Sequence, residues 1–281
     1  MEWIRKLCDN DCQYFFQPHE HTPERQFLRM SPTSESFRLD GRYALVTGGA
    51  SGIGEATCKE LARAGASVIV ADIQDEKAAA LAASLDGARA LHLNVTQQDS
   101  IRAAVASIEK LDILVNNAGI ANVGDITKVE PEDFDRVMEV NVKSVYLVTK
   151  AFLPLLLESR GSIVNIGSVA GQVGIKQRFA YCTSKGAVLA MSRQLAVEYP
   201  KELRVNCICP GTVQTPFVEG YLERYHAHEK DKIRAELNAR QPIGRVGYPE
   251  EIASLVRYVC SDEAAFMTGA LLPIDGGWTA A

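Results

Sequence analysis

The feature that most constrains the fold is an alternation, from Leu39 onward, of short apolar runs with longer amphipathic segments. The short runs are apolar at consecutive positions, which is typical of strands buried on both faces of a parallel sheet. These expected strands are residues 43–47, 67–71, 90–93, 113–115, 162–166, 204–208 and 270–274. The expected helices include residues 54–64, 99–110, 134–157, 181–199 and 249–260. The pattern predicts an α/β fold with a doubly wound parallel sheet, which binds ligands at the carboxyl ends of its strands.

Residues 39–281 are expected to form a single domain. No internal repeat or linker-like break follows residue 39, and about 240 residues suit one domain of this architecture. The first 38 residues contain three prolines and no sustained hydrophobic period. We therefore expect residues 1–38 to be a flexible N-terminal extension.

Composition argues against several classes of function. The 281 residues include 30 Lys and Arg against 35 Asp and Glu, a net charge of −5, which disfavours nucleic-acid binding. No stretch approaches the roughly 18 consecutive apolar residues of a membrane span. The seven cysteines form no C-x-x-C pair, which favours reduced thiols in the cytoplasm. Cys8, Cys12, His19 and His21 match the spacing of no common zinc finger, so no metal site is expected.

A glycine-rich turn joins the first expected strand to the first helix, with the sequence TGGASGIG from Thr47 to Gly54. Glycines allow a sharp turn, a close approach of the backbone to a pyrophosphate, and tight packing of helix on sheet. Free N–H groups at the start of the helix can then bind the anion. The turn alone is also compatible with a tight loop that binds nothing.

An acidic residue at the end of the second expected strand strengthens the nucleotide interpretation. Asp72 follows Gly54 by eighteen residues, where a carboxylate can accept hydrogen bonds from a ribose and repel a 2′-phosphate. No Lys or Arg lies between Gly48 and Gly54 or directly after Asp72. The sequence therefore predicts NAD rather than NADP, the alternative for Asp72 being a helix cap or a loop acid.

Over residues 39–281 the chain resembles the short-chain dehydrogenase/reductase family. The matching motifs are the turn TGGASGIG, NNAG from Asn116, Asn141, Ser168, YCTSK from Tyr181, PGTVQT from Pro210 and DGG from Asp275. The resemblance implies a Rossmann-like single domain. It also implies cofactor contacts from Gly48, Ser51, Gly52, Ile53, Gly54, Asp72, Asn94, Val95, Asn117, Ala118, Gly119, Tyr181, Lys185, Pro210, Gly211, Val213 and Thr215. Many relatives carry Asp where this chain has Asn94, and an amide can still bond adenine there.

Tyr181 and Lys185 are the centre of the expected catalytic set. They are four residues apart and share one face of a helix. A phenol with an ordinary pKa near 10 is a poor base at neutral pH, but an ammonium and the positive nicotinamide ring both favour the phenolate. The resemblance implies that Ser168 bonds the reacting oxygen and that Asn141 holds a water linking Lys185 to solvent. The alternative is a partly buried surface pair.

Arg178 is the candidate substrate residue, because its planar guanidinium lies three residues before Tyr181 and suits a carboxylate. Here the chain resembles dehydrogenases of small hydroxy acids and sugar acids, including the 3-hydroxybutyrate and 2-keto-3-deoxy-L-fuconate types. The alternative is a solvent-facing loop arginine. Residues 217–240 are expected to form a substrate lid with Phe217, Tyr221, Leu222 and Tyr225 as its apolar edge.

These features predict an NAD-dependent oxidoreductase acting on a small-molecule secondary alcohol or ketone, with a tyrosine as general acid and base. Three alternatives stay open: a neutral sugar or polyol dehydrogenase, an NADPH-dependent 3-oxoacyl thioester reductase, and a non-catalytic dinucleotide sensor. A homotetramer is expected, because two helices carry more apolar residues than one buried face requires. These residues are Val145, Leu147, Val148, Phe152, Leu155, Leu156, Leu189, Leu195 and Val197. The alternative is that these helices lie deep in the core of one subunit.

Overall fold

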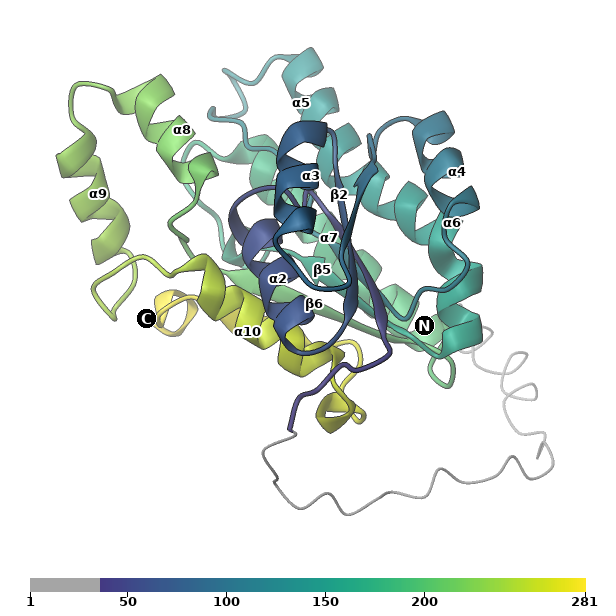
Figure 1. Ribbon diagram of the computed structural model, residues 1–281. Helices are drawn as coiled ribbons and strands as arrows, with labels where there is room; N and C mark the ends of the chain where they lie inside the picture. Colours follow the sequence, from purple (N-terminus) through teal and green to yellow (C-terminus); the bar gives the residue numbers. More distant parts are fainter. Residues whose placement is uncertain (1–35) are drawn as a thin grey trace, which may run out of the picture. The chain divides into compact units, whose positions relative to one another are not determined.

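The structure, a computed structural model, describes residues 36–281 except the side chain of residue 226 (Figure 1). Cys8, Cys12, His19 and His21 therefore lie outside the described residues. Residues 36–281 form one compact unit around a seven-stranded sheet, in the order β3-β2-β1-β4-β5-β6-β7. The strands are β1 Tyr43–Thr47, β2 Ser67–Asp72, β3 Arg89–His92, β4 Ile113–Asn116, β5 Ser162–Ile166, β6 Arg204–Pro210 and β7 Leu271–Ile274. Every neighbouring pair is parallel, which confirms the doubly wound fold.

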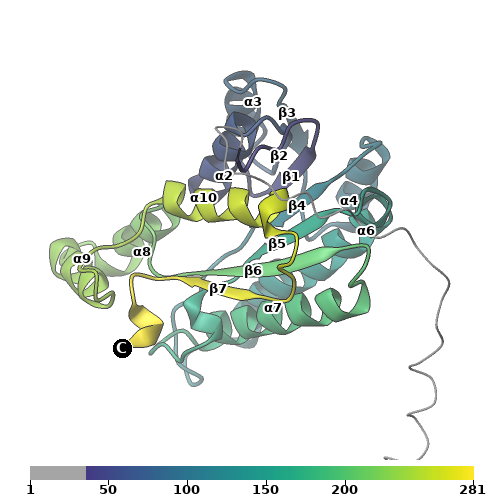
Figure 2. The ribbon, with the colours of Figure 1, turned by 90° about the horizontal axis from the view of Figure 1, so that it is seen from below.

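Helices cover both faces of the sheet, as Figure 2 shows from below. They are α2 Gly52–Arg63, α3 Asp75–Ala83, α4 Gln98–Ala106, α5 Pro131–Met138, α6 Ser144–Ser159, α7 Phe179–Glu198, α8 Pro216–His226, α9 Lys230–Ala239 and α10 Pro249–Cys260. Buried side chains of α2, α3 and α10 form one apolar core with the sheet. Those of α4, α6 and α7 form the core on the opposite face. Burial on both faces explains why the strands are apolar at consecutive positions.

The segment predicted as one helix over residues 134–157 consists of α5 and α6 joined by a π-helical turn, Glu139–Lys143. Residues 131–159 are long and apolar enough to span a membrane by length and composition. However, Val148, Phe152 and Leu156 are buried in the core against the sheet. Packing against the sheet therefore accounts for the buried apolar side of this helix.

Most of the apolar residues expected to pair between subunits lie inside their own subunit. Val145, Val148, Phe152, Leu156 and Leu189 are buried, and Leu147, Leu155 and Leu195 pack partly buried against the same core. The helices use these residues to cover the sheet. Of the nine residues, Val197 is the exposed one, with 71% of its surface accessible.

The expected lid is a hairpin of two helices, α8 and α9, drawn in green in Figure 1. Leu222, which was expected on its apolar edge, packs with Ile233 and Leu237 in a small core between the two helices. Phe217 and Tyr225 remain about half exposed. One face of α8 therefore packs against α9, and another face presents half-exposed aromatic rings.

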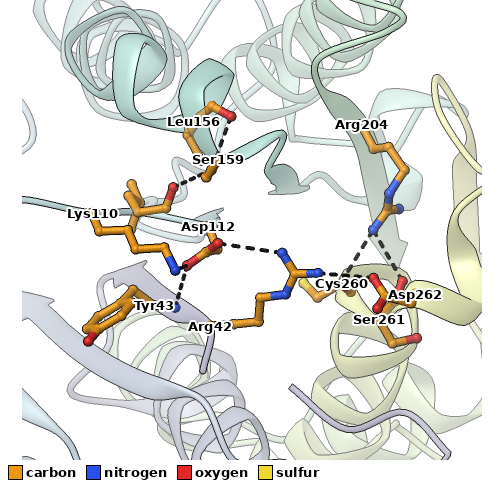
Figure 3. Close-up of polar contacts among 11 residues, drawn as sticks. Arg42, Tyr43, Lys110, Asp112, Leu156, Ser159, Arg204, Cys260, Ser261 and Asp262 are labelled. Carbon is orange, nitrogen blue, oxygen red and sulfur yellow. Dashed lines mark hydrogen bonds and ion pairs between the residues drawn. The ribbon is translucent and has the colours of Figure 1, made fainter. Parts of the chain in front are cut away.

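A polar network joins the amino ends of the strands (Figure 3). Asp112, just before β4, is almost fully buried and lies 3.5 Å from both Arg42 and Lys110. Its other contact is the backbone N–H of Tyr43, which donates to Oδ2 at 2.9 Å. Arg204, the first residue of β6, donates to the carbonyl oxygens at the end of α10. These contacts stabilise the end of the sheet at which the strands begin.

Candidate active site

The glycine-rich turn follows β1 at the point where the strand order changes direction, between β1 and β4. Gly48 and Gly52 have φ angles of +62° and +56°, in the left-handed region that favours glycine. A Cβ atom on Gly54 would lie 2.1 Å from the carbonyl oxygen of Gly48. A side chain would therefore clash with the backbone at Gly54 and would be strained at Gly48 and Gly52.

The start of α2 is suited to bind an anion. Ser51 occupies the N-cap position in an extended conformation, but within residues 36–281 no side chain caps this helix end. A Cβ atom on Gly52 would lie 3.4 Å from the Thr215 side chain, so the segment after β6 closes over the same turn. Backbone N–H groups of the first helical turn, including that of Ile53, are the donors that a pyrophosphate requires. The residues present therefore fit a dinucleotide.

The end of β4 is fastened to the glycine-rich turn. The Asn117 amide donates to the carbonyl oxygens of Thr47 and Gly48 at 2.9 and 3.0 Å. The backbone N–H groups of Asn117 and Ala118 both donate to the Thr47 hydroxyl. The NNAG motif thus forms the second wall of the expected cofactor cleft, on the other side of the change in strand order.

Asp72 ends β2 with 5% of its surface exposed. Its two carboxylate oxygens accept hydrogen bonds from the backbone N–H groups of Ala50 and Gln74, each at 3.0 Å. The carboxylate is therefore held against the glycine-rich turn. Asn94 lies after the neighbouring strand β3, and its side-chain oxygen accepts from the N–H and hydroxyl of Thr96. Next to it, Val95 is 9% exposed.

The expected catalytic residues come from β5 and α7. Ser168 follows β5, and its Oγ accepts a hydrogen bond from the Ala170 N–H at 3.1 Å. Tyr181 and Lys185 lie one turn apart on α7, with Lys185 Nζ 5.8 Å from the centroid of the Tyr181 ring. The ammonium donates to the Ile166 carbonyl oxygen at 2.8 Å. Serine, tyrosine and lysine are therefore gathered at the carboxyl end of β5.

Asn141 lies in the π-helical turn, between the catalytic candidates and the expected cofactor cleft. Its Oδ1 accepts from the Ile120 N–H at 2.8 Å, and its Nδ2 donates to the Ile120 carbonyl and the Ser184 hydroxyl. A Cβ atom on Gly119 would lie 3.3 Å from Asn141 Oδ1 and 3.8 Å from Lys185 Nζ. Single-turn π segments often mark functional sites, and this one brings Asn141 to the helix carrying Lys185.

Burial dominates the ionisation of the site. It raises the pKa of the Tyr181 phenol above its ordinary value, and a hydrogen bond with Ser168 and the charge of Arg178 oppose this change. Burial also lowers the pKa of Lys185 to about 8. The sequence argument expected the Lys185 ammonium to lower the pKa of Tyr181. In the structure, Ser168 and Arg178 are the groups that oppose the effect of burial on the pKa of Tyr181, and the Lys185 ammonium donates to the Ile166 carbonyl.

The segment after β6 forms the remaining wall. A Cβ atom on Gly211, which follows Pro210, would lie 2.9 Å from the Asp275 Cα, so this motif packs on the DGG motif. Val213 pairs in a short parallel bridge with Gly247. Thr215 Oγ1 accepts from the Val218 N–H and so caps α8. The structure thus joins the cofactor wall directly to the lid.

Arg178 and the lid make contacts that the sequence did not reveal. The guanidinium carbon of Arg178 lies 4.7 Å from the centroid of the Tyr221 ring on α8. The Phe217 ring lies 6.5 Å from that of Tyr181. The only sequence signal for these pairs is the four-residue spacing of the two lid aromatics. Arg178 is therefore a partly buried residue of the site rather than a fully solvated loop residue.

Asn122 is a second residue that sequence reasoning missed. It lies between Ile120, which Asn141 holds, and Gly124, which pairs with Arg178 in a short bridge. Its side-chain oxygen is buried and has no hydrogen-bond partner among residues 36–281. No sequence pattern distinguishes it from its neighbours. In the same part of the chain, no group of three or more His, Cys, Asp or Glu side chains could hold a metal ion.

Comparison with known proteins gives consistent matches. A sequence profile of the family described as "Enoyl-(Acyl carrier protein) reductase" matches residues 48–279. The dehydrogenase/reductase SDR family member 6 of Aquarana catesbeiana is 41% identical over 246 residues, covering 86% of this chain and 99% of that protein. The 2-keto-3-deoxy-L-fuconate dehydrogenase of Xanthomonas campestris pv. campestris is 40% identical over 251 residues, covering 88% of this chain and 83% of that protein.

The fold also matches solved structures. The ligand-free aldohexose dehydrogenase of Thermoplasma acidophilum superimposes with a TM-score of 0.80 and 32% sequence identity. The match covers 88% of this chain and 96% of that chain.

Proposed function

Since the chain belongs to the short-chain dehydrogenase/reductase family, we propose that it is an NAD-dependent dehydrogenase of a small hydroxy acid or sugar acid. The observation that carries the acid preference is the position of Arg178. Arg178 is the N-cap residue of α7, the helix that carries Tyr181, and its positive charge lowers the pKa of the phenol. A substrate whose alcohol reaches Tyr181 can therefore place a carboxylate at the guanidinium.

Tyr181 is the proposed general base and acid. In oxidation its phenolate takes the proton of the substrate alcohol, while Ser168 donates a hydrogen bond to the reacting oxygen. Lys185 keeps an ammonium near the phenol below its pKa of about 8. Asn141 fixes the backbone beside this lysine through Ile120. A bound nicotinamide supplies the hydride acceptor for oxidation and the hydride donor for reduction.

The proposed cofactor is NAD, because of Asp72. Its carboxylate lies at the end of β2 beside the anion-binding turn, where the adenosine ribose of a dinucleotide is expected. A negative charge there accepts bonds from two ribose hydroxyls and repels a 2′-phosphate. The pyrophosphate would be held at the start of α2, and Asn94 would offer its amide to the adenine.

A 3-oxoacyl thioester reductase using NADPH is the second candidate. The 3-oxoacyl-[acyl-carrier-protein] reductase FabG of Thermotoga maritima, which is 38% identical over 251 residues, favours it. The lid argues against it, since α8 and α9 carry many charged side chains, several of them joined in ion pairs such as Arg234 with Glu219. A neutral sugar substrate would offer no carboxylate to Arg178. A dinucleotide sensor without activity would not require Ser168, Tyr181 and Lys185 together.

One experiment tests the proposal. Hydroxy acids, their neutral amides, polyols and 3-oxoacyl thioesters are assayed with NAD(H) and NADP(H) by following NAD(P)H absorbance. The proposal expects the highest kcat/KM for a hydroxy acid with NAD⁺. A higher kcat/KM for a thioester with NADPH would favour the second candidate. Equal values for an acid and its amide would remove the role of Arg178.

We further infer a cytoplasmic homotetramer. The five cysteines within residues 36–281 are all free thiols, as expected in a reducing compartment. Apolar surface remains on both outer helices, where Tyr146 of α6 is 50% exposed and Val197 of α7 is 71% exposed. Phe266, just before the edge strand β7, is fully exposed. Symmetric pairing of such surfaces would cover them.

A further inference from the structure

The lid helix α8 and the start of α7 meet through two parallel contacts. Phe217 lies against Tyr181, and Tyr221, one turn further along α8, lies against Arg178. The two lid residues are four apart on α8, and their two partners are three apart at the start of α7, so each pair shares one side of its helix. The lid therefore touches the proposed base and the proposed carboxylate-binding residue at the same time.

We propose that Tyr221 is a positioning residue that holds the Arg178 guanidinium at the mouth of the site, so that the lid helix sets the affinity for a substrate carboxylate. This inference rests on the proposed function, because it assumes that Arg178 binds the substrate acid. Tyr221 itself forms no bond with the substrate. It acts through Arg178.

The backbone of Arg178 is already fixed, which leaves its long side chain as the mobile part. The Gly124 N–H donates to the Gln177 carbonyl at 3.0 Å, and the Phe179 N–H donates to the Gly124 carbonyl at 3.1 Å. One guanidinium nitrogen of Arg178 donates to the Gln177 carbonyl at 2.9 Å. The guanidinium carbon then lies over the Tyr221 ring, well within the roughly 6 Å range of a cation–π contact.

Stacking and carboxylate binding use different parts of the guanidinium. An aromatic ring attracts the positive charge of a guanidinium and can contact its flat face, whereas a carboxylate accepts two parallel hydrogen bonds from its edge. Tyr221 can therefore hold Arg178 without competing with the substrate. Because fewer side-chain conformations then have to be frozen on binding, the ordered arginine binds the acid more tightly.

Replacing the ring tests this role. Tyr221→Leu should raise the KM for 3-hydroxybutyrate about three- to tenfold, the range of a cation–π contact, with kcat within about twofold. The KM for the neutral 3-hydroxybutyramide should not change. Tyr221→Phe keeps the aromatic face and should restore the KM for the acid to within about twofold of the unmodified protein.

Two controls separate positioning from a general effect on the fold. Tyr43→Leu removes a similar contact between a tyrosine and a cation, since Lys110 Nζ lies 5.3 Å from the centroid of the Tyr43 ring. Tyr43 lies at the amino end of β1, away from the site, so this variant should leave both KM values unchanged. In the Arg178→Ala background, Tyr221→Leu should have no further effect on the KM for the acid. Melting temperatures of all variants verify that each protein is folded.

The outcomes distinguish the two proposals. If Tyr221→Leu raises the KM of acid and amide alike, or acts undiminished in the Arg178→Ala background, the positioning role is wrong. The proposed function would then survive as long as the unmodified protein prefers the acid to the amide. If the unmodified protein oxidises acid and amide with equal kcat/KM, or oxidises no hydroxy acid or sugar acid, the proposed function is contradicted and the role of Tyr221 falls with it.

Discussion

Tyr181 is the proposed base, yet its burial disfavours the phenolate form that accepts the proton. Removing the phenol from water raises its pKa, so the group needs neighbours that favour the phenolate before it can accept a proton near neutral pH. The chain supplies a hydrogen bond from Ser168 and the positive charge of Arg178. Each of these contacts therefore has a kinetic consequence that single substitutions can measure.

Tyr181→Phe should lower kcat about 10²- to 10⁴-fold, because it removes the proton-transferring hydroxyl and keeps the ring. Binding of NADH, measured by fluorescence titration, should stay within about twofold. The ring contact with Phe217 is retained in this variant, which preserves the packing of the lid. Substantial residual turnover would identify a different group as the base.

Asp72 should determine the choice of cofactor. We expect kcat/KM with NAD⁺ to exceed that with NADP⁺ at least about tenfold, or 1.4 kcal/mol, because the carboxylate repels a 2′-phosphate. Asp72→Ala combined with Ile73→Arg should shift the preference toward NADP⁺. The measurement is kcat/KM for both cofactors at one saturating alcohol concentration. Comparable values for the unmodified protein would contradict the assignment.

Arg178→Ala should have two separable effects. Loss of its charge raises the pKa of Tyr181 further, so the rising limb of the pH profile of alcohol oxidation should move to higher pH for every substrate. Loss of the carboxylate partner should cost about 2–4 kcal/mol in kcat/KM for a hydroxy acid and much less for its amide. Arg178→Lys should restore the pH profile better than the acid preference, because an ammonium lacks the bidentate edge. An equal loss for acid and amide would show that the arginine is structural.

The two ends of the sheet have different roles. At the carboxyl ends of the strands, backbone turns and side chains build the site. At the amino ends, arginines join strands to helix ends, most clearly Arg204, whose guanidinium reaches the carbonyl oxygens of Val259, Cys260 and Ser261. Since a buried carbonyl group without a partner is costly, this residue should stabilise the junction of β6 and α10.

Arg204→Ala should lower the free energy of unfolding by about 2–4 kcal/mol, because several carbonyl groups lose a charged donor at once. Arg102→Ala is the matched control. That arginine pairs with Asp99 on an exposed helix surface, and its loss should change stability by less than about 0.5 kcal/mol. Denaturant unfolding measures both. An unchanged kcat/KM in the Arg204 variant would show that its role is confined to stability, and a stability loss equal to that of the control would contradict it.

The order of strands and the main helices could be predicted because burial on both faces leaves a strong apolar signal along the chain. The helix Asp75–Ala83 was missed, since it is short, rich in alanine and only weakly amphipathic. The π-helical turn at Asn141 was also missed, because hydrophobic periodicity does not distinguish it from a continuous helix. The site motifs could be placed along the chain by their spacing. Contacts between α8 and α7 could not, because they depend on how the lid lies over the sheet.

The assembled sheet and its two helical layers leave apolar surface outside the core, which leads to the last prediction. Val197 and Tyr146 are exposed on α7 and α6, and the other apolar residues of these helices largely serve their own subunit. We expect sedimentation at micromolar concentration to show a homotetramer. Val197→Asp combined with Tyr146→Asp should produce smaller species, because pairing would bury the new carboxylates without partners. Retained secondary structure in circular dichroism would show that the variant still folds. A stable monomer of the unmodified protein would reject the tetramer and imply that these helices serve one subunit alone.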